Sequence, residues 1–306
     1  MAANPVSVII PTFNRRLSLL RCLQHLEHQT VSNFDVIVVD DGSTDETREF
    51  LAQFSQSSSL CLKVLHQSNS GPTRARNFAL REASSPLCIL IGDDILVAPD
   101  FVERHLEIHR ANPEETVVVL GLTRWDTEHQ ELTPFMRWVE DIQFSYAELD
   151  AGTPPDWRYF YTSNLSFNTQ LFLDYPFDET YQAAFDDMEL GYRIQMAGKL
   201  SMRYCPEAFA THVHPTSFMS AARRMQMVGR AEAHFLQDHP EAELLFSKRH
   251  PLKQAAYDFL AKRPRLLDRL TTASNALLQE RRPNFLISGL LMAHHRFGRT
   301  TYRKTR

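Results

Sequence analysis

The stretch Leu87-Cys88-Ile89-Leu90-Ile91-Gly92-Asp93-Asp94 joins five consecutive apolar residues to a glycine and two neighbouring carboxylates. The apolar run predicts a buried strand. Two adjacent carboxylates repel each other, and burying them costs free energy unless a cation compensates their charge. In open α/β sheets, ligands bind beyond the carboxyl ends of the strands. The stretch therefore predicts that Asp93 and Asp94 form a site for Mg²⁺ or Mn²⁺ and for phosphate oxygen.

The alternative interpretation of this pair is a loop whose acids cap the helix that follows. An isolated pair of aspartates more often has this structural role than a metal-binding one. The rest of the sequence has to decide between the two.

The composition is that of an ordinary globular protein, with 43% hydrophobic and 23% charged residues among 306, enough for one large domain or a domain with an appendage. The net charge of −4 gives no overall basic field, which argues against nucleic-acid binding. No CxxC pair occurs, which disfavours a zinc site or a disulfide framework and fits a reducing cytoplasm. The four cysteines are Cys22, Cys61, Cys88 and Cys205.

The N-terminus lacks a basic segment followed by an apolar one, so we expect no signal peptide. No apolar run approaches the ~18–20 residues that span a bilayer. These features together predict a cytoplasmic protein without a membrane-spanning helix.

Strand and helix patterns alternate along the first half of the chain. Leu19, Leu23 and Leu26 recur at helical spacing, and Ser43 with Glu46 has the spacing of a capping box, which predicts a helix start. Short connections between such elements predict an α/β fold with a doubly wound, mostly parallel sheet flanked by helices. The expected strands are residues 6–10, 34–39, 61–65 and 87–91, and further helices are expected after 70–72 and over 99–111.

Polar clusters follow three of these strands, at residues 12–14, 40–42 and 92–94. Strands of a parallel sheet end at one edge, so the clusters should converge there. That strand ends are simply polar is the alternative, but it explains two separate Asp-Asp pairs less well. No GxGxxG follows the first strand, which disfavours a dinucleotide-binding enzyme.

In the second half, residues 116–120 predict a strand, and the aromatic segment 134–155 is expected to be irregular, as a flap or wall of the substrate site. Short strands are expected over 199–204 and 208–211, with His212 and His214 directly after them. Histidines at i and i+2 on a strand point to opposite faces, so only one should reach a shared ion unless the strand has ended. An ordinary packed or surface histidine is the alternative for each.

Asp186, Asp187 and Glu189 begin a helix, where acids also stabilise the helix dipole without any catalytic role. From residue 217 the pattern is helical. The chain then ends in a basic segment, which is either solvated or attracted to an anionic membrane surface. Its basic residues are Arg296, Arg299, Arg303, Lys304 and Arg306.

In their order and spacing, these motifs resemble those of the family 2 glycosyltransferases of the GT-A fold. The resemblance covers residues 5–216. It implies a GT-A domain over residues 1–216, with a nucleotide-binding half 1–112 and an acceptor-binding half 113–216, and leaves 217–306 as a helical C-terminal extension. The matching segments are residues 6–14, 38–43, 71–77 and 92–94, and Asp186-Asp187-Met188-Glu189-Leu190 with Arg193.

The resemblance also implies roles for individual residues. Asp187 would be the catalytic base, and a divalent Mn²⁺ or Mg²⁺ ion would be held by Asp94, Asp93 and His212, with His214 as the other candidate. The chain departs from the commonest pattern in having Gly92-Asp93-Asp94 in place of Asp-x-Asp, and Asp186 where Glu is frequent. The residues that would bind the nucleotide sugar are Pro11, Thr12, Phe13, Asp40, Asp41, Arg76 and Asp93.

The activity that the resemblance implies is that of an inverting, metal-dependent glycosyltransferase. A nucleoside-diphosphate sugar, with UDP as the expected nucleotide, would donate its sugar to a hydroxyl of a saccharide or lipid-linked acceptor in cell-surface polysaccharide or glycoconjugate biosynthesis. The departing diphosphate needs a cation, and the acceptor hydroxyl needs a carboxylate base. The expected location is cytoplasmic, with peripheral contact to the inner membrane face through the basic C-terminus.

Two other classes remain open at this point. A sugar nucleotidyltransferase would share the sheet, metal and nucleotide, but it needs a glycine-rich basic loop after the first strand, and residues 12–16 contain no glycine. A non-catalytic carbohydrate-binding relative would be favoured by loss of Asp94 or Asp187, and both are present.

Overall fold

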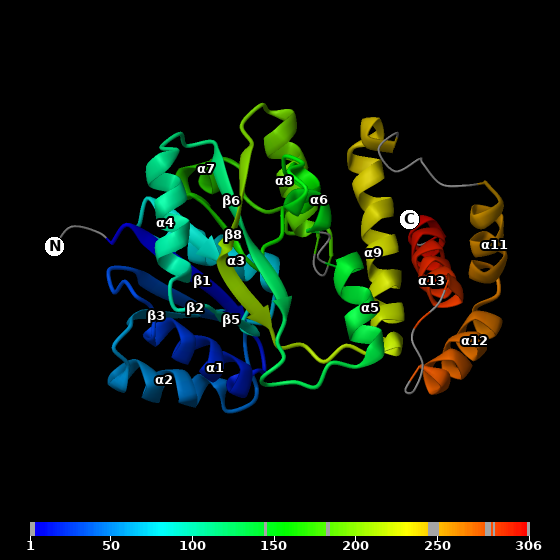
Figure 1. The fold of residues 1–306 in the computed structure, drawn as a ribbon, viewed down its shortest axis with the longest axis horizontal. Coiled ribbons are helices and arrows are strands. Elements are labelled where there is room, and N and C mark those ends of the chain that lie inside the picture. Colours follow the sequence, from blue (N-terminus) through cyan, green and yellow to red (C-terminus); the bar gives the residue numbers. More distant parts are fainter. Residues whose placement is uncertain are drawn as a thin grey trace. The chain divides into compact units, whose positions relative to one another are not determined.

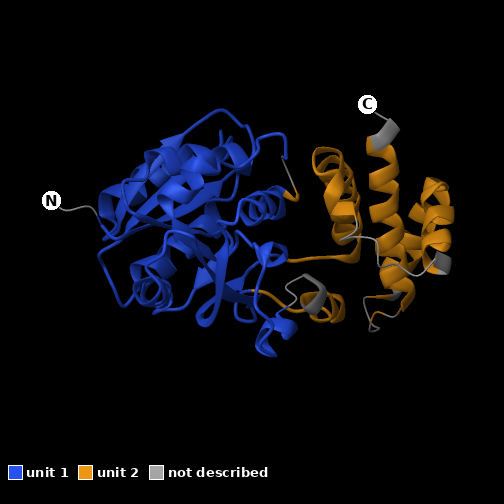
Figure 2. Cartoon of the chain, turned by 90° about the horizontal axis from the view of Figure 1, so that it is seen from above, with its two compact units in different colours: residues 1–129, 144–182, 186–214 blue, residues 130–143, 183–185, 215–306 orange. Residues whose placement is uncertain are grey.

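The computed structural model describes residues 4–143, 146–181, 184–243, 251–278, 283 and 285–304. The chain divides into two compact units (Figure 2). Unit 1 comprises residues 1–129, 144–182 and 186–214, and unit 2 comprises residues 130–143, 183–185 and 215–306. Unit 2 thus includes residues 130–143 as well as the C-terminal part, for which residue 217 was the predicted start.

Within the described residues, unit 1 is built on an eight-stranded sheet with strand order β3-β2-β1-β4-β7-β6-β8-β5 (Figure 1). The first four strands in this order are parallel, as are β6 and β8, whereas β7 and β5 run antiparallel to their neighbours. A mostly parallel sheet was predicted, and the observed sheet is mixed, with both parallel and antiparallel strand pairs. The strands are β1 Val6–Thr12, β2 Asp35–Asp40, β3 Cys61–His66, β4 Leu87–Leu90, β5 Ile95–Val97, β6 Val117–Trp125, β7 Leu165–Asn168 and β8 Ser201–His212.

Helices flank this sheet, and its central strands are buried on both faces, because residues that point to opposite sides of β1, such as Val8 and Ile9, are both inaccessible to solvent. Leu19, Leu23 and Leu26 are buried as their helical spacing predicted. The helices of unit 1 are α1 Arg16–Glu27, α2 Thr47–Ser57, α3 Pro72–Glu82, α4 Phe101–Ala111, α6 Ala147–Asp150, α7 Thr169–Asp174 and α8 Asp186–Met196, with a 3₁₀ turn at Trp157–Tyr159.

The local prediction at the start of α2 was wrong. Ser43 and Glu46 form no capping box, since the helix begins at Thr47 and the Glu46 side chain makes no capping hydrogen bond. Asp45 instead accepts a hydrogen bond from the Thr47 backbone N–H at 3.0 Å. A nearby aspartate supplies the acceptor and moves the helix start by one turn.

The predicted strands of the second half also needed correction. Residues 199–204 and 208–211 are parts of one strand, β8, whose pairing with β6 shifts register after Gly121, so that a bulge separates the two apolar runs. Strand β5 was not expected. It is only three residues long and pairs with β8 through Ile95 and His212, a contact that local sequence patterns do not reveal.

The aromatic segment 134–155 is largely helical and not irregular. Helix α5 spans Pro134–Gln143 and α6 spans Ala147–Asp150. Phe135, Met136 and Val139 are buried at helical spacing, which explains why the aromatic residues favour a helix here. Phe144 lies outside the described residues.

A buried polar network ties α4 to strand β7. Asn164 donates to the carbonyls of Leu122 and Ala208, so its Oδ1 atom can only accept, and it accepts from His105 Nε2 at 2.9 Å. His105 Nδ1 must then accept from the Ser166 hydroxyl at 2.8 Å, and Ser166 accepts from His109 Nε2 at 2.9 Å. Each link fixes the next, and both histidines are neutral donors in this arrangement.

Unit 2 is helical, with α5, α9 Phe218–Asp238, α11 Pro251–Ala261, α12 Pro264–Leu277 and α13 Phe285–Lys304, and a 3₁₀ turn at Pro240–Ala242. Helices α9 and α13 approach closely because each contributes a glycine to the contact. A Cβ atom on Gly229 would overlap the carbonyl of His295, and one on Gly298 would overlap that of Gln226. The two backbones can pack at this distance only without side chains there.

An ion-pair group next to this crossing includes two of the basic residues near the end of the chain. Glu232 is buried on α9 and binds Arg299 Nη1 at 2.8 Å and His295 Nε2 at 3.0 Å. Arg296 binds Asp258 at 2.6 Å. Two of the five basic residues therefore bind acids of unit 2, while the side chains of the remaining three lie outside the described residues.

Among the described helices, none combines the length and the apolar character that crossing a bilayer requires.

The His105–Ser166–His109 network predicts a loss of stability in mild acid. Burial lowers the pKa of His105 to about 3 and that of His109 to about 4. In the unfolded chain both protonate below about pH 6.5. The stabilisation is thus complete above that pH and falls as pH decreases, by about 2 kcal/mol for each histidine at pH 5.

Urea unfolding followed by circular dichroism at pH 7.5 and pH 5.0 measures this effect. Relative to wild type, His105→Gln should remove about half of the pH-dependent loss assigned to the two histidines, whereas His28→Gln, at an exposed position, should leave it unchanged. An identical pH dependence in His105→Gln and wild type would contradict the assignment.

Candidate active site

The carboxyl ends of β1, β2 and β4 bring the polar clusters together at one edge of the sheet. Thr12 ends β1 and is paired in register with Asp40, which ends β2. Asp93 follows β4 and accepts a hydrogen bond from the Thr12 hydroxyl at 2.7 Å. The first and third predicted clusters therefore meet through a direct hydrogen bond, and the second lies beside them in register.

Asp40 and Asp41 are both buried, and each is bound by groups of the chain itself. Asp40 accepts from the Ser43 backbone at 2.9 Å and contacts His66 at 3.1 Å, and these contacts lower its pKa although burial alone would raise it. Asp41 accepts from Gln67, Ser70 and Gly71 at 2.7–2.8 Å. Asp41 thereby shapes the loop that leads into α3, and its contact with a nucleotide base stays a prediction.

The first loop is held by a residue to which the sequence analysis gave no role. Asn14 has a positive φ of 55°, and its side-chain oxygen accepts from the backbone N–H groups of Thr44 and Asp45 at 2.7 and 3.2 Å. This contact locks residues 12–15 against the loop after β2. Pro11 is half-buried and Phe13 is 42% exposed, so the Phe13 ring is available to a ligand.

Arg15 is the cation that the Asp93–Asp94 pair binds within the chain. Its Nη1 atom lies 3.0 Å from Asp93 Oδ1 and 2.5 Å from Asp94 Oδ2. One guanidinium nitrogen bridges two buried carboxylates from a side chain that is itself 40% exposed. This role of Arg15 was not predicted from the sequence, although the need of the pair for a cation is a signal that could have indicated it.

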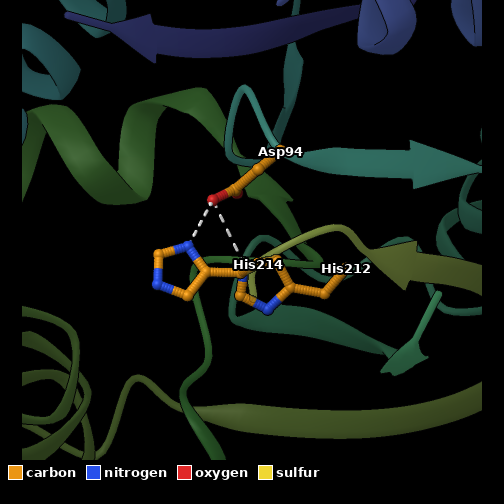
Figure 3. A group of neighbouring side chains, drawn as sticks. All are labelled: Asp94, His212 and His214. Atoms are coloured by element: carbon orange, nitrogen blue, oxygen red, sulfur yellow. Dashed lines mark ion pairs between the residues drawn. The ribbon is translucent and has the colours of Figure 1, made fainter. Parts of the chain in front are cut away.

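His212 and His214 both reach the same oxygen of Asp94 (Figure 3). His212 Nε2 and His214 Nδ1 each lie 3.3 Å from Asp94 Oδ2. Strand β8 ends at His212, so the strand alternation that would have sent the two rings to opposite faces no longer applies at His214. The structure therefore groups both histidines with Asp94, where the sequence analysis favoured His212 alone.

Neighbouring groups fix this arrangement. The His212 ring stacks on Trp125 at 5.2 Å and on His214 at 5.3 Å between ring centroids. The Asp94 carbonyl accepts from the Val213 N–H at 2.9 Å, and Ile95 pairs with His212 across β5 and β8. The short strand β5 thus holds Asp94 against the segment that carries both histidines, and Trp125 at the end of β6 is a further residue that the sequence did not indicate.

The pKa values of the two carboxylates are shifted in opposite directions. Burial and the charge of Asp94 raise the pKa of Asp93 to about 6. Burial also disfavours charge on Asp94, but the hydrogen bonds from His212 and His214 and the charge of Arg15 outweigh it and hold the pKa of Asp94 well below its usual range. As the pH falls, Asp93 should therefore take up a proton before Asp94 does.

The donor set formed by Asp94, His212 and His214 fits a divalent metal ion. Each residue offers one ligand atom, and the three atoms lie within 4.8 Å of one another. Donors that bind one ion at about 2.1 Å are separated by about 3.0–3.5 Å, which the two 3.3 Å contacts match. A carboxylate with two imidazoles suits Mn²⁺ better than Mg²⁺, which prefers oxygen ligands alone.

The acidic start of α8 supplies the remaining predicted residues. Arg76 on α3 binds Asp186 at 2.7 Å and lies 5.6 Å from the Phe177 ring centroid, so its guanidinium is engaged within the chain, and its contact with the nucleotide stays a prediction. Asp187 is half-buried in the first turn and accepts from the Met188 N–H at 2.8 Å. Burial raises the pKa of Tyr161, with smaller contributions from Tyr146 and the Asp187 carboxylate, which places Asp187 in electrostatic reach of that phenol.

Arg15 binds Asp94 Oδ2, the oxygen that faces both histidines and that a divalent ion held by the three residues would also bind, so Arg15 and the ion should compete. Arg15→Gln should raise the affinity for Mn²⁺ about tenfold in the absence of nucleotide, because the ion then no longer displaces a guanidinium. The adjacent Arg16 is the matched control, since it is 43% exposed and binds Glu46 at 3.4 Å. Titration of free Mn²⁺ by electron paramagnetic resonance measures both variants. Weaker Mn²⁺ binding in Arg15→Gln, or equal gains in both variants, would contradict the competition.

Residues 7–167 match the family model described as "Glycosyl transferase family 2". The "Validoxylamine A glucosyltransferase" of Streptomyces hygroscopicus subsp. jinggangensis (strain 5008) is 32% identical over 221 residues, which cover 63% of this chain and 52% of that protein. The "Uncharacterized glycosyltransferase YfnE" of Bacillus subtilis (strain 168) is 29% identical over 263 residues, covering 70% and 66%. The chain therefore spans about half to two thirds of the length of these relatives.

Solved structures share the fold at low sequence identity. The mannosyltransferase PcManGT from Pyrobaculum calidifontis, in complex with GDP-Man and Mn²⁺, matches with a TM-score of 0.67 at 20% identity, covering 99% of this chain and 88% of that chain. Residues 1–349 of S. aureus TarS, in complex with UDP, match with a TM-score of 0.53 at 19% identity, covering 98% and 92%. These neighbours have the GT-A fold that the resemblance implied. Because the family model covers more than half of its length, the chain belongs to glycosyl transferase family 2.

Proposed function

We propose that this protein is an inverting, metal-dependent glycosyltransferase that uses a nucleoside-diphosphate sugar. UDP is the proposed nucleotide, and the acceptor is a hydroxyl of a saccharide or lipid-linked glycan in cell-surface polysaccharide or glycoconjugate biosynthesis. Residues 1–216 form the transferase domain in this proposal. The observation that carries it is the cluster of Asp94, His212 and His214 beside Asp93, at the sheet edge where α/β proteins bind ligands.

The relatives support this proposal by their names and bound ligands. One curated relative is named a glucosyltransferase, and solved neighbours are complexes with UDP and with GDP-Man and Mn²⁺. Both of these neighbours bind a nucleoside diphosphate or its sugar, and the base is uracil in one and guanine in the other. We base the proposal of UDP on the family resemblance.

The metal ion would be held by Asp94, His212 and His214, and it would stabilise the negative charge of the departing diphosphate. Mn²⁺ is the proposed ion because the donor set mixes one carboxylate with two imidazoles. Asp93 lies next to this set and is held by Thr12, from where it can accept a hydrogen bond from the ribose. Phe13 offers an exposed ring beside which a base can pack.

Asp187 is the proposed general base. The acceptor hydroxyl loses its proton to the Asp187 carboxylate while the oxygen attacks the anomeric carbon from the side opposite the diphosphate, which inverts that centre. Its neighbour Asp186 is neutralised by Arg76, so the two adjacent acids have different tasks. Asp186 joins α8 to α3 through this ion pair, and Asp187 is the acid to which we assign the acceptor proton.

We also propose a cytoplasmic location. All four cysteines are free, and three of them are buried, which fits a reducing compartment.

Donor identity can be tested by thermal shift with UDP-, GDP- and dTDP-sugars, each with Mn²⁺ and with EDTA. We expect one nucleotide, UDP, to raise the melting temperature by several degrees only when Mn²⁺ is present, because the diphosphate and the ion bind together. Equal stabilisation by UDP in EDTA would argue against the metal site as the diphosphate anchor. Stabilisation by nucleoside triphosphates instead of nucleotide sugars would favour a nucleotidyltransferase.

If Asp187 is the general base, its substitution should lower turnover without weakening donor binding. Asp187→Asn keeps the size and the first-turn position but removes the base, so release of nucleoside diphosphate in the presence of a saccharide acceptor pool should fall about 10²-fold or more. Donor binding by calorimetry should stay within about twofold of wild type.

Asp174→Asn, at an exposed position on α7, is the matched control and should keep full turnover. Unchanged turnover in Asp187→Asn would move the base to another carboxylate or remove the need for one.

A further inference from the structure

A segment of unit 2 combines exposed apolar side chains with exposed arginines. Phe259 at the end of α11 is 50% exposed, and Leu266 and Leu270 on α12 are 38% and 39% exposed. Arg263, Arg265 and Arg269 are exposed in the same stretch, and no ion pair of theirs is found among the described residues. We call the six residues Phe259, Arg263, Arg265, Leu266, Arg269 and Leu270 the α12 surface.

The two leucines of this surface lie outside the face that α12 buries against the rest of unit 2. Helix α12 already buries Leu267 and Thr271, which lie one position further along than Leu266 and Leu270. Leu266 and Leu270 are one helical turn apart and therefore form a second stripe beside the buried one. A helix that has buried one face and still presents two leucines outward has apolar surface left for a partner.

The arginines follow the same spacing. Arg265 and Arg269 are also four residues apart and run beside the leucine stripe, and Asp268 is the only acid in α12. The Arg263 guanidinium lies 3.7 Å from the Phe259 ring centroid, which joins the end of α11 to the start of α12. Leucines flanked by arginines along one helix are the pattern of a helix that lies at a lipid–water interface.

We propose that the α12 surface docks on an anionic lipid bilayer, with the leucines and Phe259 entering the headgroup region and the arginines binding lipid phosphates. A second copy of this chain fits less well, because a two-fold symmetric contact would bring the arginines of both copies together. Nucleic acid would leave the leucines uncovered. The inference assigns a membrane contact to helix α12, whereas contact through the basic C-terminal residues stays a prediction from the sequence.

The inference does not depend on the transferase activity. A bilayer contact would bring the protein close to a lipid-linked acceptor. Because the bilayer contact and the donor chemistry use different residues, an experiment can refute one without refuting the other.

Co-sedimentation of the full chain with lipid vesicles tests the proposal. Binding is expected to vesicles of phosphatidylcholine with phosphatidylglycerol, to weaken at high salt, and to be absent with phosphatidylcholine alone. Each arginine near the surface contributes roughly fivefold to partitioning, so Arg265→Gln/Arg269→Gln should lower it at least about tenfold. Leu266→Ser/Leu270→Ser should also lower it about tenfold and leave less binding at high salt.

Two double variants serve as matched controls. Arg48→Gln/Arg81→Gln removes the same charge from exposed positions of unit 1, and Leu173→Ser/Met196→Ser removes exposed apolar side chains there. Both controls should sediment as wild type does. Circular dichroism checks that each variant is folded, and the arginine pair still tests the proposal if the serine pair is unfolded.

The proposal is overturned if the wild-type chain stays in solution with anionic vesicles, or if the unit 1 charge control loses as much binding as Arg265→Gln/Arg269→Gln. It is also overturned if Leu266→Ser/Leu270→Ser abolishes a concentration-dependent dimer in sedimentation velocity without changing vesicle binding, because the surface would then belong to a second copy. Donor binding in the thermal-shift assay should be the same for all these variants.

Discussion

Two adjacent carboxylates, Asp93 and Asp94, are buried at the carboxyl end of β4, and the rest of the site is arranged to make that burial tolerable. Like charges side by side in a low dielectric cannot both persist without compensation. The chain supplies it from three directions, with Thr12 donating to Asp93, Arg15 bridging both carboxylates and two imidazoles lying against Asp94. The groups that compensate the charge of the pair also leave it able to bind a divalent ion, since Arg15 can be displaced and the two histidines can become ligands.

Short elements of the fold position the residues of this site. The three-residue strand β5 follows the pair directly and joins β8 at the residue where β8 ends. This contact brings His212 and His214 to Asp94, and the Trp125 ring stacks against His212 from the neighbouring strand. On the far side of β8, the neutral His105–Ser166–His109 network holds α4 to β7. Rigid support on both sides keeps donor atoms at the separation that a metal ion needs.

The sequence allowed the strands of the parallel half, the buried stripe of α1 and the convergence of the strand-end clusters to be predicted, because each follows from local periodicity and one topological rule. It did not allow β5, the bulge in β8 or the pairing of both histidines with Asp94 to be predicted. These depend on residues far apart in the chain, such as Ile95 opposite His212. The prediction of a capping box at Ser43 was wrong because Asp45 provides a hydrogen-bond acceptor closer to the start of the helix. Both residues are good local signals for a helix start. Asn14, Arg15 and Trp125 acquire their roles only through contacts made in the folded chain.

The central claim is that Asp94, His212 and His214 together hold the divalent ion that binds the diphosphate. Pulsed electron paramagnetic resonance of the Mn²⁺-loaded protein with UDP tests it most directly. We expect one Mn²⁺ species with couplings to two imidazole nitrogens and to phosphorus, because both histidines and the nucleotide share the ion. A Mn²⁺ ion coupled to phosphorus but to no nitrogen would show that the diphosphate binds its metal elsewhere, and would contradict the account.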